Sequence, residues 1–83
     1  MKDTIMNMVK EAVFQYNTAV RIMNRKSTFE NECHAQRCFA YLKGLVDMFN
    51  NLHTDKYIEI TYKSLDFLVE VIDCQLVEQF TIL

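Results

Sequence analysis

The chain has 83 residues, a formal net charge of −2, one glycine and no proline. A chain of this length forms one domain with a small core, which is usually stabilised further by a disulfide, a metal or a partner chain. Turn-rich β architectures depend on glycine and proline, so their near absence favours long helices joined by short loops. The negative charge disfavours a nucleic-acid binder that is held by phosphate contacts.

The three cysteines and the absence of targeting segments indicate the compartment. Three is an odd number, whereas small secreted domains pair their cysteines in disulfides. The N-terminus lacks the basic-then-apolar run of a signal peptide, and no window is long and apolar enough for a membrane span. We therefore expect a cytoplasmic protein without a membrane partner, and the Asn, Lys, Ile, Met and Tyr content suits the AT-rich genome of a bacterium or phage.

The first expected helix covers residues 3–24. One face repeats apolar residues at three- and four-residue steps, which is the spacing of an α-helix; they are Ile5, Val9, Ala12, Val13, Tyr16, Ala19, Val20 and Met23. Phe14 lies off this line, among polar residues. We therefore expect Phe14 to be exposed and available to a partner.

The second expected helix covers residues 28–50, and Ser27 with Glu30 is expected to form its capping box. Its inner face is apolar and consists of Ala35, Cys38, Phe39, Leu42, Leu45, Val46, Phe49 and Leu52. A second stripe runs beside that face and consists of His34, Arg37, Tyr41, Gly44 and Met48. A mid-helix glycine costs about 1 kcal/mol relative to alanine, so Gly44 suggests close approach by another helix.

The third expected helix covers residues 55–80. Its charged residues follow helical spacing and comprise Asp55 with Lys56, Glu59, Lys63, Asp66, Glu70 and Asp73. Nearly all other residues there are apolar, so this helix would be covered on several sides. The alternative is a strand from Tyr57 to Tyr62, where β-branched and aromatic residues alternate with polar ones. The continuous charged line favours the helix.

These elements predict an all-α fold, an up-down-up three-helix bundle in a single domain 1–83 that is completed by dimerisation. Residues 1–26 carry five basic and two acidic side chains and residues 55–83 two basic and six acidic ones, so we expect the two segments to pack together. The apolar end, from Phe80 to Leu83, would join the core or a partner. The expected interface residues are Phe14, Tyr41, Gly44, Met48, Tyr57, Ile60, Phe67 and Val71.

One cluster has the chemistry of metal ligands. His34 and Cys38 lie four residues apart on one helix face, and an antiparallel third helix would bring Cys74 level with them. Zinc accepts such ligands, although paired Cys-x-x-Cys motifs are missing and cysteine often packs as a small apolar side chain. Core cysteines are therefore the simpler interpretation. We expect no cofactor and no catalytic residues, since a narrow bundle offers no cleft.

The sequence therefore predicts a small non-enzymatic helical module that binds protein, as a homodimer or as a subunit or inhibitor docked on a larger protein. Two alternatives remain open. One is a nucleic-acid-linked regulator that uses Arg21, Arg25, Lys26 and Arg37. The other is a metal-binding protein that uses the cysteine and histidine cluster.

Overall fold

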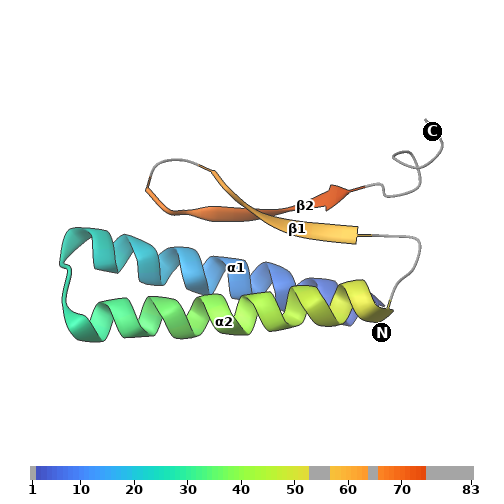
Figure 1. Ribbon diagram of the computed structural model, residues 1–83, viewed down its shortest axis with the longest axis horizontal. Helices are drawn as coiled ribbons and strands as arrows, with labels where there is room; N and C mark the ends of the chain where they lie inside the picture. The colour runs from blue at the N-terminus through green and yellow to red at the C-terminus, as the bar shows by residue number, and fades with distance from the viewer. Residues whose placement is uncertain (1, 53–56, 64–65, 75–83) are drawn as a thin grey trace.

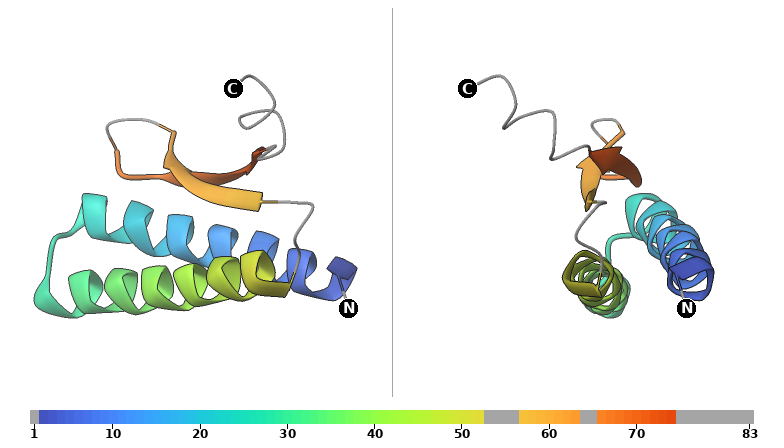
Figure 2. Two further views of the ribbon diagram at one scale, coloured as in Figure 1. Left: turned by 45° about the vertical axis from the view of Figure 1, so that its right-hand side comes forward. Right: turned by 90° about the vertical axis from the view of Figure 1, so that its right-hand side faces the viewer.

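Two long helices and a β-hairpin form two layers in this protein (Figure 1). The structure, a computed structural model, describes residues 2–52, 57–63 and 66–74. Its elements are α1 (Lys2–Arg25), α2 (Phe29–Leu52), β1 (Tyr57–Tyr62) and β2 (Val69–Cys74). The helices are antiparallel neighbours, and the hairpin lies along one side of the pair (Figure 2). The arrangement is α+β.

The predicted all-α three-helix bundle is wrong, because residues expected in the third helix form the two strands. Both strands alternate: Ile58 and Val69 are buried, whereas the neighbouring Glu59 and Glu70 are exposed. The charge spacing of three and four residues, which had suggested a helix, does not exclude this alternation, because each strand is only six residues long. The β-branched and aromatic content favours strands, because these side chains pack well on a pleated surface.

The first two helices form close to their expected bounds, and neither is long and apolar enough to cross a membrane. The start of α2 differs in detail from the expected capping box of Ser27 and Glu30. The Thr28 hydroxyl accepts the N–H of Asn31 at 3.1 Å, which makes Thr28 the cap. The Ser27 hydroxyl instead donates to the Glu32 carboxylate at 3.1 Å.

The register of the hairpin decides which backbone groups face outward. The strands are antiparallel, with Ile58 opposite Asp73, Ile60 opposite Val71 and Tyr62 opposite Val69. Lys63 N–H donates to the Leu68 carbonyl at 2.8 Å, and hydrogen-bonded pairs alternate along an antiparallel ladder. In the pairs of Tyr62 with Val69, Ile60 with Val71 and Ile58 with Asp73, the N–H and C=O groups therefore point away from the partner strand.

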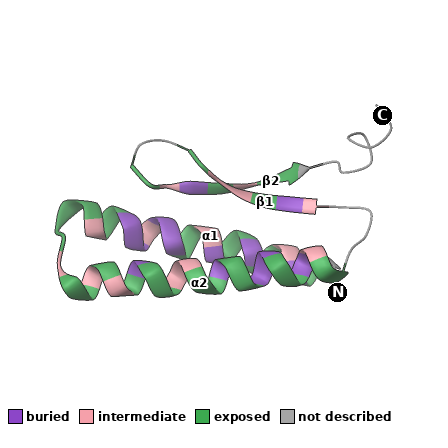
Figure 3. Cartoon of the chain, viewed as in Figure 1, coloured by how far each residue is buried: buried purple, intermediate pink, exposed green. Residues whose placement is uncertain are grey.

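The hydrophobic core lies between the two helices and beneath the hairpin (Figure 3). Its largest fully buried side chains are Val9, Val20, Leu42, Phe49, Ile58 and Val69. Each strand thus contributes one of these residues. Ile60, Leu68 and Val71 are partly buried against the core, so the hairpin covers one face of the helix pair.

Two asparagines attach the hairpin to the helices. The Asn17 amide of α1 donates to the Val69 carbonyl and accepts the Val69 N–H, both at 2.9 Å. The Asn50 amide of α2 does the same to Ile58, at 3.0 and 2.9 Å. Each helix therefore satisfies both outward backbone groups of one strand residue, which would otherwise lack partners.

The first and last described segments do lie together, since β2 packs on α1. Among the described residues, Lys43 and Asp47 form an ion pair at 3.5 Å within α2, which does not join the two segments. The contact between α1 and β2 instead consists of apolar packing and the Asn17 amide, which is only 7% exposed.

Replacing Asn17 with alanine is expected to destabilise the protein by about 2–3 kcal/mol, because the N–H and C=O of Val69 lose their partners in a buried place. Urea unfolding followed by circular dichroism measures the effect. Asn7→Ala, at an exposed position on the same helix, serves as the control and should change the unfolding free energy by less than about 0.5 kcal/mol. Equal effects of the two substitutions would contradict the role assigned to Asn17.

Candidate functional site

A groove runs between α2 and the hairpin. One part has a volume of about 460 Å³ and is lined by Tyr16, Met23, Glu32, Ala35, Gln36, Phe39, Tyr62 and Phe67. The other has a volume of about 240 Å³ and is lined by Phe39, Lys43, Val46, Asp47, Asn50 and Tyr57 to Ile60. Phe39 lines both parts, so we treat them as one feature, the α2–β1 groove.

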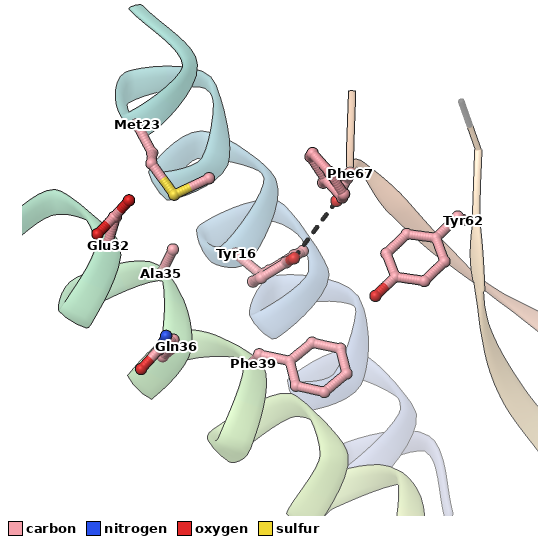
Figure 4. Close-up of a pocket in the computed structure, with 8 residues that line it drawn as sticks. All are labelled: Tyr16, Met23, Glu32, Ala35, Gln36, Phe39, Tyr62 and Phe67. Atoms are coloured by element: carbon pink, nitrogen blue, oxygen red, sulfur yellow. Dashed lines mark hydrogen bonds between the residues drawn. The ribbon is translucent and has the colours of Figure 1, made fainter. Parts of the chain in front are cut away.

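Aromatic rings from three elements surround the wider part of this groove (Figure 4). Tyr16 of α1 and Phe39 of α2 have ring centroids 5.5 Å apart. Tyr62 and Phe67 of the hairpin meet edge to face, with centroids 6.5 Å apart and planes at 81°. Such pairs add about 0.5–1.5 kcal/mol beyond their burial. The wider part is therefore a largely apolar hollow with aromatic walls, and Glu32 and Gln36 add polar groups to its lining.

Tyr16 supplies the polar contact between these walls. Its hydroxyl donates to the Phe67 carbonyl at 3.3 Å. Burial raises the pKa of Tyr16 above its ordinary value, and the nearby Tyr62 raises this pKa further. The Tyr16 phenol is therefore held neutral, as a hydrogen-bond donor rather than a reactive phenolate.

Phe67 has a strained backbone. Its φ is 67°, in the left-handed region that bulky side chains rarely adopt. Hydrogen bonds from α1 hold the backbone around it, since Asn24 donates to the Asp66 carbonyl at 3.0 Å and Asn17 pairs with Val69. The strain presents the Phe67 ring, which is 57% exposed, at the rim of the groove.

The helix pair has a second apolar surface, on the side away from the hairpin. Ile22 precedes Asn24 by two residues and Met48 precedes Asn50 by two, and two residues turn an α-helix through about 200°. Asn24 bonds to Asp66 just before β2 and Asn50 bonds to Ile58 of β1, so both side chains point towards the hairpin. Ile22 and Met48 therefore face away from the hairpin. We call this surface the outer helical face; its exposed apolar residues are Met8, Ile22, Tyr41, Met48 and Leu52.

The eight residues expected at an interface do not form one surface. Phe14, Tyr41, Gly44 and Met48 are exposed on the helices, and a Cβ added at Gly44 would meet nothing within 4 Å. No close approach within the described chain therefore requires that glycine. The remaining four, Tyr57, Ile60, Phe67 and Val71, belong to the hairpin, where Phe67 is exposed and the others are partly buried.

Phe14, at 68% exposure, is open to solvent as its position in the sequence predicts. It lines a shallow hollow of about 220 Å³ between the helices, together with Gln15, Thr18, Ala19, Ile22, His34 and Cys38. This hollow borders the outer helical face through Ile22. The exposed aromatic ring therefore shares a hollow with one residue of that face, Ile22.

The residues expected to bind a metal are not assembled. His34 Nε2 lies 3.8 Å from Cys38 Sγ, so the expected pair shares a helix face. Cys74, however, is paired with Tyr57 in the hairpin, near the end of α2 and far along that helix from Cys38. No group of three metal-binding side chains occurs among the described residues.

The basic residues considered for a nucleic-acid regulator, Arg21, Arg25, Lys26 and Arg37, are all exposed. Sequence reasoning missed the roles of Asn17 and Asn50, and it placed Tyr16 and Phe39 only in a core. The signal that pointed towards the groove was the alternation of Ile58, Glu59, Ile60 and Thr61. Comparisons with protein-family models, with curated proteins and with solved structures find no match to this chain.

Replacing Phe67 with glycine and, separately, with alanine tests the backbone strain at this position. Phe67→Gly is expected to be more stable than Phe67→Ala by about 1 kcal/mol, because glycine adopts a positive φ without a steric penalty. Both variants lose the aromatic ring, so the difference between their free energies of unfolding, measured by chemical unfolding, reports the backbone alone. At Leu45, which lies in a regular helix, the order should reverse by a similar amount. An alanine variant as stable as the glycine variant at position 67 would contradict the strain.

The raised pKa of Tyr16 makes stability depend on alkaline pH. The unfolded chain loses the Tyr16 proton near pH 10, whereas the folded protein keeps it to higher pH, so the stability contributed by the neutral phenol is full below about pH 10 and declines above it. Tyr16→Phe should therefore lose less stability than the natural protein between about pH 9.5 and 11. Urea unfolding across this range measures the difference, and identical pH profiles would contradict it.

Proposed function

We propose that this protein is a non-enzymatic protein-binding module that self-associates through its outer helical face. The observation that carries the proposal is the exposure of large apolar side chains along both helices, on the side that the hairpin leaves uncovered. Tyr41 is 52% exposed and Met48 is 47% exposed, although both lie in regular helix. Large exposed apolar side chains on one side of a helix pair are typical of protein interfaces.

The positions of these residues place them on the same side of the helix pair. Tyr41 and Met48 are seven residues apart and Leu52 follows four residues later, so the three share a stripe of α2. Met8 and Ile22 form the matching stripe of α1. Since the helices are antiparallel neighbours, the two stripes lie side by side and resemble half of a four-helix packing.

A second copy suits this face because a two-fold contact needs the same patch on both partners. Exposed charges of opposite sign lie within the two stripes, with Glu11 between Met8 and Ile22 on α1 and Arg37 four residues before Tyr41 on α2. Placing α1 of one copy against α2 of the other would bring these unlike charges together in the contact. The free thiols of Cys33 and Cys38 support a reducing, cytoplasmic location for the module.

An added negative charge in the centre of the face tests the proposal. Tyr41→Glu and Met48→Glu are each expected to weaken self-association by about 2–3 kcal/mol, because the carboxylate would be buried without a partner. Multi-angle light scattering and sedimentation equilibrium measure the mass against concentration. Both variants should remain helical by circular dichroism.

Gln36→Glu is the matched control, because it adds the same charge to the same helix on the side of the α2–β1 groove. It should leave the dimer unchanged. If the natural protein is monomeric at about 1 mM, or if the control dissociates the dimer as strongly as Tyr41→Glu does, self-association through the outer face is wrong.

A further inference from the structure

The outer edge of β1 has unused pairing groups. The N–H and C=O of Ile60 and Tyr62 point away from β2, as those of Ile58 do. Ile58 is satisfied by Asn50, but in the described part of the chain no hydrogen bond reaches the outward groups of Ile60 or Tyr62. Such an edge is a template for a further strand.

Asn50 shows what kind of pairing this edge accepts. Its side-chain amide both donates to and accepts from the backbone of the single residue Ile58, at 3.0 and 2.9 Å. Two residues that exchange both hydrogen bonds are the hydrogen-bonded pair of an antiparallel ladder. Asn50 therefore occupies the first position of an antiparallel third strand, and Ile60 and Tyr62 are the next two positions along the same edge.

The α2–β1 groove provides room for the rest of that strand. Neighbouring strands are about 4.8 Å apart, whereas packed helices are about 8–10 Å apart, so two strands cover less width than two helices. The uncovered width lies over α2, where the volumes of about 240 and 460 Å³ are found. Phe39 lies where these two spaces meet and gives an added strand an apolar surface to pack on.

The charges along the groove select the partner. Lys43 is paired with Asp47 at 3.5 Å, which leaves Glu32 and Glu59 as the other charged residues that border the groove. Both are acidic and exposed. Because Glu59 faces outward from the sheet, a cross-strand neighbour of opposite charge would be a lysine or arginine.

We propose that the β1 edge binds an extended segment of another protein, as an antiparallel third strand in which apolar residues alternate with basic ones. The apolar residues lie opposite Ile60 and Tyr62 and point into the groove, and the basic residues point outward beside Glu59. This mode of recognition takes its affinity from main-chain hydrogen bonds and its specificity from alternate side chains. It uses a different surface from the outer helical face and does not depend on dimerisation.

The same edge of a second copy does not fit this site. Asn50 reaches the outward groups of Ile58, so α2 extends to the outer side of β1. Pairing β1 with β1 of another copy would place the two α2 helices closer than the 8–10 Å that helix packing needs. A single extended segment without a helix beneath it avoids this clash.

The test uses a fluorescein-labelled peptide of sequence Lys-Val-Lys-Val-Lys-Val-Lys, acetylated and amidated at its ends, titrated with the full chain by fluorescence anisotropy. In antiparallel pairing, the valines that enter the groove also carry the bonding N–H and C=O groups. N-methylation of the valines should therefore weaken binding at least about tenfold, whereas N-methylation of the lysines should change it less than about threefold. The peptide with Glu in place of Lys should bind at least about tenfold more weakly.

Two proline substitutions locate the edge on the protein. Ile60→Pro removes one outward N–H from β1, and proline is tolerated at strand edges. Val71→Pro is its matched control, because Val71 is the cross-strand partner of Ile60 and points its N–H outward from the opposite edge. Ile60→Pro should weaken peptide binding about tenfold, and Val71→Pro less than about threefold, with circular dichroism confirming that both variants are folded.

Several results would overturn the proposal. These are no saturable binding of the basic peptide up to about 1 mM, equal binding of the acidic peptide, or equal loss with the two proline variants. Greater loss on methylating the lysines than the valines would exclude the antiparallel register. A dimer that Ile60→Pro converts to a monomer would show that a second copy occupies the edge instead. The N-methylated peptides keep the test decisive if a proline variant unfolds.

Discussion

The structure depends on two side-chain amides, which make hydrogen bonds to the edges of the hairpin that a neighbouring strand would otherwise make. A two-stranded hairpin is marginally stable alone because both of its edges lack partners. Asn17 and Asn50 each satisfy the two outward backbone groups of one residue, Val69 and Ile58, and these two residues are fully buried. The amides therefore fix the hairpin on the helices at the positions where its side chains enter the core.

The same arrangement leaves each edge of the hairpin only partly satisfied. Just before β2, α1 also holds the Phe67 carbonyl through Tyr16, which stabilises a backbone conformation that the Phe67 side chain disfavours. On β1, α2 supplies Asn50 and nothing further to Ile60 and Tyr62 among the described residues. The strained rim and the open edge border one groove, so the features that hold the hairpin also shape a place for an extended chain.

Two layers of unequal width expose apolar surface on both sides of the helix pair. The hairpin covers one side incompletely, and the outer helical face with Tyr41 and Met48 has no cover in the described part of the chain. A small chain has too little sequence to cover two long helices completely. The two proposed contacts lie on opposite sides of the helix pair, so self-association and strand addition can take place in the same molecule.

The sequence alone determined α1 and α2, because apolar spacing sustained over 24 residues in each helix has a single interpretation. It also determined that Phe14 faces solvent. It did not determine the hairpin, since the charges from Glu59 to Asp73 fit a helix or two strands of six residues equally well. Only the tertiary structure decided between them, because the deciding contact joins Asn17 to Val69 across 52 residues. The groove followed from the same contact: Tyr16 and Phe39 are core positions by spacing, and they line a binding surface only because the hairpin docks beside them.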